Sequence, residues 1–104
     1  MSVSDSDIAQ VHDLFASLGQ LSHRKMMGGL SIYQDGRIFA ILDSEGTLFL
    51  KASGDFARAL AAEGARKFEM EDGRGMNYWT MPEDALDDPD AASGWARRAL
   101  DALN

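Results

Sequence analysis

The sequence predicts an α+β fold in which an antiparallel sheet, built from a strand meander and a second hairpin, packs with N-terminal, middle and C-terminal helices. Apolar residues recur at spacings of three and four near both ends and in a short middle segment, which is typical of helices. The segments between them are rich in aromatic and β-branched residues and are divided by glycine-containing turns, which is typical of hairpins. Because strands and helices do not alternate strictly, parallel crossovers are not expected.

Residues 4–18 are predicted as the first helix. Their apolar positions form one stripe, which consists of Ile8, Val11, Phe15 and Leu18. Ser4 or Ser6 can accept a hydrogen bond from a free N–H group at the helix start, and Gly19 is a natural stop.

Three strands of a meander are predicted at residues 27–33, 37–42 and 47–51. The turns at 34–36 and 44–46 each supply a glycine where a tight hairpin needs a positive φ. Neighbouring strands are therefore expected to pair antiparallel, in the order of the sequence. Gly28 and Gly29 have no Cβ atom, which indicates a bulge or a close backbone approach rather than a phosphate-binding loop.

Residues 55–63 are predicted as a short middle helix, with Asp55 or Ser53 as its N-terminal cap and Gly64 as the residue that terminates it. A glycine at this position tolerates the left-handed conformation that often ends a helix.

A second hairpin is predicted from residues 67–71 and 76–81, joined by a turn at 72–75. Adjacent side chains of a strand point to opposite faces of the sheet, so Tyr78 and Trp79 are expected to face opposite sides. One of these two rings is therefore a candidate for an accessible contact surface.

The C-terminal segment is predicted to be helical after a short turn at residues 82–86. The helix restarts after Asp88, where Pro89 occupies the favoured first helical position. Its apolar positions form a sustained stripe, which consists of Ala92, Trp95, Ala96, Ala99, Leu100 and Leu103. Such a stripe has to pack against another element.

The chain is predicted to form one domain, residues 1–104, because its 45% hydrophobic content supplies one core and its length leaves no room for a second. No apolar run approaches the roughly 20 residues that cross a bilayer. The start of the chain is acidic and polar, unlike a secretory signal, so a cytoplasmic location is expected. The absence of cysteine excludes disulfides and cysteine metal sites.

The formal net charge of −7 argues against a free-standing nucleic-acid-binding protein, since Lys and Arg supply most non-specific affinity for phosphates. The charge is uneven, with −6 in residues 69–104 and −1 in residues 1–68. An ordinary solvated surface explains the basic residues of the first part. The alternative is a locally basic face, which would consist of Arg24, Lys25, Arg37, Lys51, Arg66 and Lys67.

The sequence contains no recognisable catalytic or metal-binding motif. His12 and His23 lack a paired ligand spacing and are expected to be surface or helix-end histidines. The segment Gly73-Arg74-Gly75 lacks the third glycine of a dinucleotide fingerprint and is interpreted as a hairpin loop. Acidic residues cluster around two predicted helix starts, where capping explains Glu83, Asp84, Asp87, Asp88 and Asp90. The protein is therefore predicted not to be an enzyme and to carry no cofactor.

Several short motifs share their order and spacing with a known family. They are Arg24-Lys25-Met26-Met27-Gly28-Gly29, Ile32-Tyr33, Asp35-Gly36-Arg37, Phe39-Ala40, Leu48-Phe49-Leu50-Lys51, Phe56, Gly64, Phe68, Met76-Asn77-Tyr78-Trp79, Pro82-Glu83, Leu86-Asp87-Asp88 and Trp95-Ala96. Together they resemble the N-terminal domain of the TfoX/Sxy family of competence regulators, from about Phe15 to Leu103.

This resemblance implies a non-catalytic α+β domain that takes part in regulating bacterial DNA-uptake genes, where family members act with the cyclic-AMP-responsive activator at promoters. Met27 stands where the family usually has Phe, which is a volume-tolerant exchange in a core. The chain ends near Asn104 without the helical C-terminal domain of full-length regulators, so a single-domain member is expected.

The leading hypothesis is a regulatory domain that binds a transcription-associated protein, and the acidic C-terminal third favours a basic partner. Direct nucleic-acid binding is the alternative. Small-ligand binding or catalysis is the third reading and would need a deep pocket. A homodimer is left open, and no membrane partner is expected. The candidate binding residues are Arg24, Lys25, Tyr33, Arg37, Lys51, Tyr78 and Trp79.

Overall fold

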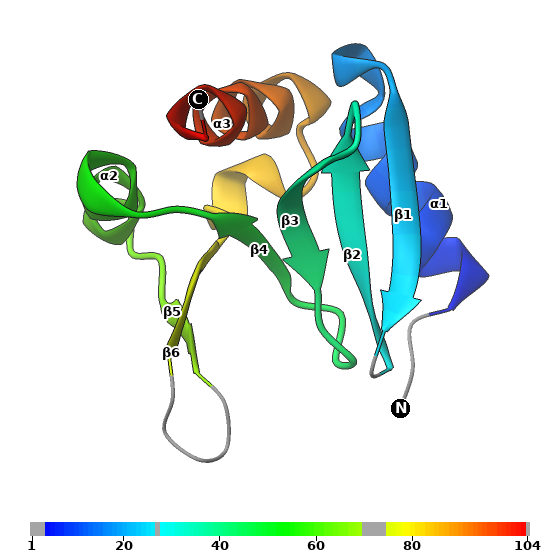
Figure 1. Cartoon of the computed structure of the whole chain (residues 1–104), viewed down its shortest axis with the longest axis horizontal. Coiled ribbons are helices and arrows are strands. Elements are labelled where there is room, and N and C mark those ends of the chain that lie inside the picture. Colours follow the sequence, from blue (N-terminus) through cyan, green and yellow to red (C-terminus); the bar gives the residue numbers. More distant parts are fainter. Residues whose placement is uncertain (1–3, 27, 70–74, 104) are drawn as a thin grey trace.

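The computed structural model describes residues 4–26, 28–69 and 75–103 and confirms the predicted α+β fold. In this part of the chain, helices and strands follow one another as predicted, apart from one additional strand near the N-terminus (Figure 1). The elements are α1 (Asp5–Leu14), η1 (Ala16–Leu18), β1 (Leu21–Met26), β2 (Gly29–Gln34), β3 (Arg37–Leu42), β4 (Leu48–Lys51), α2 (Gly54–Ala62), β5 (Lys67–Glu69), β6 (Gly75–Thr80), η2 (Glu83–Ala85) and α3 (Pro89–Ala102).

The strands form one antiparallel sheet in the order β1-β2-β3-β4-β6-β5. The meander is confirmed, since β2, β3 and β4 are neighbours in sequence order. The second hairpin joins the sheet through β6, which pairs with β4, so that β5 becomes an edge strand (Figure 1). The last strand of the sequence, β6, therefore lies inside the sheet between β4 and β5.

The additional strand β1 is one that the sequence analysis missed. It pairs with β2 along its whole length, from Leu21 opposite Gln34 to Met26 opposite Gly29. Five of its six side chains are exposed, as expected for an edge strand. The strand predicted at residues 27–33 begins at Gly29 in the structure, and Met27 lies outside the described residues.

Two glycine predictions are confirmed. A Cβ atom at Gly29 would collide with the backbone carbonyl oxygen of Leu42, so the backbones of β2 and β3 approach closely there. In the β2–β3 turn, Asp35 and Gly36 have φ angles of 51° and 79°, which is the left-handed conformation that a tight hairpin requires. The predicted turn at 72–75 lies mostly outside the described residues.

The helix ends follow the expected local chemistry with two differences. The Ser4 hydroxyl accepts a hydrogen bond from the N–H of Asp7, and the Asp7 carboxylate accepts one from the N–H of Ser4, forming a capping box. The predicted extension of this helix to residue 18 is wrong, because α1 ends at Leu14 and continues as the 3₁₀ turn η1. At α2, Ser53 occupies the N-cap position without a side-chain cap bond.

The C-terminal helix is as predicted. The Asp88 carboxylate caps α3 by accepting hydrogen bonds from the N–H groups of Asp90 and Ala91, at 3.1 and 3.3 Å. The predicted stripe is buried at Ala92, Ala96, Ala99 and Leu100, with Trp95 and Leu103 partly buried. No helix of the described residues is long and apolar enough to span a membrane.

The main core lies between the helices and one face of the sheet, which we call the helix-covered face. All three α-helices contribute buried residues to it, together with strand residues such as Leu30, Ile32 and Leu50. The rings of Phe15 and Phe39 meet edge to face at a centroid distance of 5.2 Å, joining the end of α1 to β3. The opposite side of the sheet carries a second, smaller cluster, and we call it the open face.

Candidate interaction surfaces

The open face carries an aromatic and aliphatic cluster contributed by strands alone. Ile41 on β3 lies opposite Phe49 on β4, and Lys51 of β4 lies opposite Tyr78 on β6. Ile41, Phe49 and Tyr78 are buried, and Ile38 and Phe68 pack around them. Among the described residues, no helical side chain belongs to this cluster. This cluster is therefore separate from the core that the helices form with the sheet.

Ring packing holds this cluster together. The rings of Phe49 and Phe68 meet edge to face at a centroid distance of 5.0 Å, which ties β5 to β4 across β6. Burial raises the pKa of the Tyr78 hydroxyl, and the nearby Tyr33 adds a smaller contribution in the same direction. The Tyr78 hydroxyl is therefore in an environment that disfavours a charge.

Tyr78 and Trp79 face opposite sides of the sheet, as predicted. Tyr78 belongs to the open-face cluster, whereas Trp79 is partly buried against the main core. Tyr78 is only 7% exposed, so its own ring offers little accessible surface. The more accessible aromatic group near this cluster is Tyr33, which is half-buried on β2.

The predicted basic residues do not share one face of the sheet. Arg24 lies opposite Ser31, which in turn lies opposite Ile41, and this places Arg24 on the open face with Lys51. By the same pairing rule, Lys25 lies opposite Leu30 on the helix-covered side, and Lys67 lies opposite Trp79 on that side. Arg37 begins β3 opposite Gln34, and Arg66 precedes β5.

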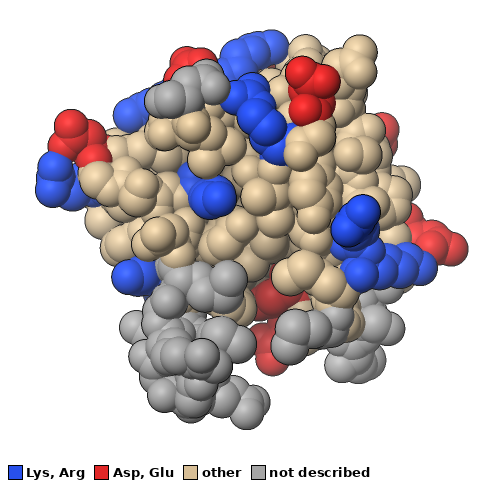
Figure 2. Space-filling view, viewed as in Figure 1, with Lys and Arg blue, Asp and Glu red and all other residues tan. Residues whose placement is uncertain are grey.

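Figure 2 shows how charge is distributed on one face of the molecule. Lys and Arg side chains are scattered over this face and separated by uncharged residues, with acidic groups among them near the edges. No continuous basic stripe is visible in this view. A phosphate backbone needs several cations along its path, so this distribution gives little support to nucleic-acid binding.

The accessible part of the open face is mixed in character. Met26 is 43% exposed, and its sulfur accepts a hydrogen bond from the Ser31 hydroxyl at 3.1 Å. Arg24 is exposed nearby on β1, and Lys51 is half-buried on β4. A protein contact surface commonly combines an apolar centre with Met and Arg side chains in this way.

The two histidines lie together, which the sequence analysis did not anticipate. His12 Nε2 on α1 and His23 Nδ1 on β1 are 2.8 Å apart, within hydrogen-bonding distance. In the described part of the chain, no three His, Cys, Asp or Glu residues are grouped as a metal site. The pair links α1 to the edge of the sheet.

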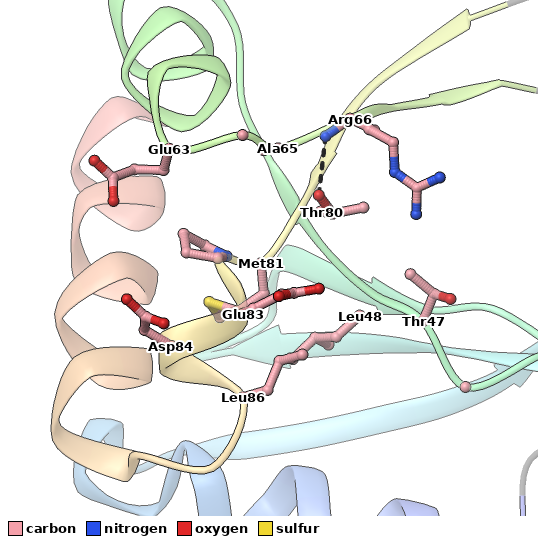
Figure 3. Close-up of a pocket in the computed structure, with 13 residues that line it drawn as sticks. Thr47, Leu48, Glu63, Ala65, Arg66, Thr80, Met81, Glu83, Asp84 and Leu86 are labelled. Carbon is pink, nitrogen blue, oxygen red and sulfur yellow. Dashed lines mark hydrogen bonds between the residues drawn. The ribbon is translucent and has the colours of Figure 1, made fainter.

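A groove lies where β4, β6 and η2 meet the turn between α2 and β5. Its larger part has a volume of about 530 Å³ (Figure 3). Leu48, Met81 and Leu86 provide apolar lining, and the Glu83 and Arg66 side chains line it from different elements. Thr80 lies at one wall, where its hydroxyl accepts a hydrogen bond from the N–H of Arg66 at 2.9 Å.

The acidic residues predicted as helix caps have separate roles. Asp88 caps α3, but Glu83 and Asp84 make no side-chain cap bond at η2 and instead line the groove. Periodicity and motif spacing gave no indication of this groove, because its residues come from several segments that are distant in the sequence.

Comparison with known proteins supports the resemblance seen in the motifs. No curated protein matches the chain. The model of the TfoX N-terminal domain family matches residues 13–103, which is most of the chain. That match begins near the end of α1 and ends just after α3, so it includes the whole sheet together with α2 and α3. The chain therefore belongs to the TfoX N-terminal domain family.

Proposed function

We propose that this chain is a non-catalytic regulatory domain that acts by contact with a transcription-associated protein. Membership of the TfoX N-terminal domain family supports a role related to competence regulation. The proposed partner is a cyclic-AMP-responsive activator, which is the partner implied by the family resemblance.

The observation that carries the proposal is the open face of the sheet. Its strand-borne cluster of Ile41, Phe49 and Tyr78 receives no helical cover from the described residues. The half-buried Tyr33 and the exposed Met26 and Arg24 side chains lie on the same face. Tyr, Met and Arg are enriched in protein interfaces, whereas phosphate binding would require more cations on the same side.

A catalytic function has less support. The groove beside β6 contains carboxylates, but all of its acidic side chains at η2 are exposed. A carboxylic acid that works as a general acid usually needs a desolvated environment, which raises its pKa. The groove therefore offers a binding surface more readily than a reaction site.

Site-directed photo-crosslinking tests the proposed contact. A photo-reactive amino acid is placed at Tyr33 on the open face, and the purified protein is mixed with the purified cyclic-AMP-responsive activator of the host. We expect a crosslinked complex from this position. The same group placed at Ala61, an exposed position on α2, is the matched control and should crosslink at most weakly.

A charge reversal then tests the surface without a chemical label. The variant Arg24→Glu should weaken the complex by about fivefold or more, since one interface arginine often contributes over 1 kcal/mol. Arg58→Glu on α2 is a control with the same change of charge. No complex with the activator, or equal effects of the two variants, would contradict the proposal.

Direct nucleic-acid binding is the alternative and has a simple test. Fluorescence anisotropy with labelled duplex DNA at low salt should show no specific association, because the basic side chains are divided between the two faces of the sheet. Binding that weakens steeply with salt and is lost in Lys51→Glu would favour this alternative instead.

A further inference from the structure

The groove beside β6 extends beyond the cavity of about 530 Å³ described above. A second cavity of about 170 Å³ shares Gly46, Leu48 and Leu86 with the first and reaches α1 at Asp7 and Leu14. The two cavities therefore adjoin at these residues, and we describe them together as one groove from the turn after α2 to the first helix. Neither cavity is closed off from solvent.

Part of the lining of this groove is apolar, and part of that apolar surface is exposed. Leu48 and Met81 are buried in its wall. Leu86, which lines both cavities, is 40% exposed. In the described part of the chain, Leu86 and Met26 are the two large hydrophobic residues with exposed side chains. Covering Leu86 by a partner would remove apolar surface from water.

The charges along the groove are mainly negative. Among the described residues, its lining includes the acidic residues Asp7, Glu63, Glu83 and Asp84, whereas Arg66 is the one cation. Asp7 is engaged in the capping box of α1. The structure shows no ion pair for the other three carboxylates among the described residues. These exposed carboxylates can therefore meet cationic groups of a partner without first losing an internal one.

We propose that this groove binds a basic, amphipathic segment of a partner protein, with apolar side chains on Leu48 and Leu86 and Lys or Arg side chains facing Glu63, Glu83 and Asp84. The negative rim matches a basic segment in charge, and complementary charge steers association and selects the partner. An open groove suits a polypeptide better than a metabolite, which usually has most of its surface enclosed.

This inference rests on the proposed function, since a partner protein supplies the segment, but it uses a different surface. The groove is formed by η2, β4 and the turn after α2, whereas Arg24 and Tyr33 lie on β1 and β2. Groove variants and open-face variants can therefore be tested separately.

The probe is a short, fluorescently labelled peptide in which leucine and lysine alternate, titrated at low salt. We expect saturable binding by anisotropy and NMR shift changes centred on Leu48, Thr80 and Leu86. A second peptide with glutamate in place of lysine should not bind. Spermidine serves as a small cation without apolar side chains.

Two pairs of variants separate the charge from the apolar contact. Glu83→Lys with Asp84→Lys should raise the peptide Kd by about tenfold, since each exposed charge pair contributes up to about 1 kcal/mol. Asp87→Lys with Asp101→Lys makes the same change of charge outside the groove and should alter the Kd less than about twofold.

The apolar contact has its own matched control. Leu86→Ser should raise the Kd by about fivefold, whereas Met26→Ser, at a similarly exposed position on the open face, should leave it unchanged. Circular dichroism checks that all four variants keep the fold.

The inference is overturned if the lysine peptide does not bind, if the glutamate peptide binds as well, or if groove and control variants behave alike. Shift changes at the groove with spermidine but not with the peptide would also overturn it, because the occupant would then be a small cation. Failure here with intact crosslinking at Tyr33 leaves the proposed function standing. Peptide binding without an activator complex would support the groove as a binding site and contradict the proposed function.

Discussion

The two faces of the sheet hold apolar side chains under different conditions. On the helix-covered face, Phe39 is fully buried, and its ring packs against Phe15 at the end of α1. On the open face, Phe49 is also buried, but its aromatic neighbour Phe68 is a half-buried strand residue. The two ring pairs have nearly the same geometry, but the first belongs to the core that includes the helices and the second to a cluster of strand residues. Stability is therefore expected to depend more on the helix-covered face than on the open face.

The largest expected effect comes from removing the equivalent ring on each face. Phe39→Ala should lower the free energy of unfolding by about 3–5 kcal/mol, because helices on one side and strands on the other limit collapse of the cavity. Phe49→Ala should cost about half as much, since side chains at an uncovered face can rearrange. Urea denaturation measures both values. Equal losses would contradict the difference between the faces.

A smaller effect is expected from overfilling the helix-covered face. Ala96 of α3 is fully buried, so Ala96→Leu should lower the free energy of unfolding by about 1–3 kcal/mol. Ala102 is exposed at the end of the same helix, and Ala102→Leu should change stability by less than about 0.5 kcal/mol. Thermal unfolding of the two variants compares the same substitution with and without tight packing. A harmless Ala96→Leu would show that this face is loosely packed.

The N-terminal cap of α3 is expected to contribute about 1 kcal/mol. Asp88→Ala removes the acceptor for the N–H groups of Asp90 and Ala91, and this weakens a helix that covers the sheet. Asp88→Asn keeps an acceptor at this position and should be close to neutral. Chemical denaturation distinguishes them, and equal stability of the two variants would exclude a role for the cap.

The smallest expected effect concerns the protonation of Tyr78 on the open face. An unfolded tyrosine loses its proton near pH 10, whereas burial raises the pKa of Tyr78 in the folded protein. Just above pH 10 the folded state binds more protons than the unfolded state, so the free energy of unfolding falls as pH rises. In the Tyr78→Phe variant, the free energy of unfolding should fall less steeply as the pH rises above 10. Identical slopes would mean that the Tyr78 hydroxyl is well solvated.

Much of the local structure could be predicted from the sequence. The start of α1 at Ser4, the turn at Asp35-Gly36 and the start of α3 after Asp88 depend on hydrogen bonds and φ angles within a few residues. Strand β1 could not be predicted in the same way. Its side chains from Ser22 to Met26 are exposed, so no alternation of buried and exposed residues marks it, and pairing with β2 defines it.

The candidate surfaces were only partly predictable. A period of two residues places Tyr78 and Trp79 on opposite faces, but it does not say which of them faces the helices. Once β1 is known to be a strand, the same period places Arg24 and Lys25 on opposite faces of the sheet. The contact between His12 and His23 and the groove around Leu86 were missed, because both join segments that only folding brings together.

The amino-acid sequence by itself determined where most helices, hairpins and caps lie, and the order of its motifs indicated the family. These features depend on sterics and hydrogen bonds between residues that are close along the chain. Only the tertiary structure decided that β6 inserts beside β4, that no described helix contributes to the cluster on the open face, and that an acidic groove forms beside η2. These outcomes depend on pairing and burial between distant segments, which local preferences along the chain do not specify.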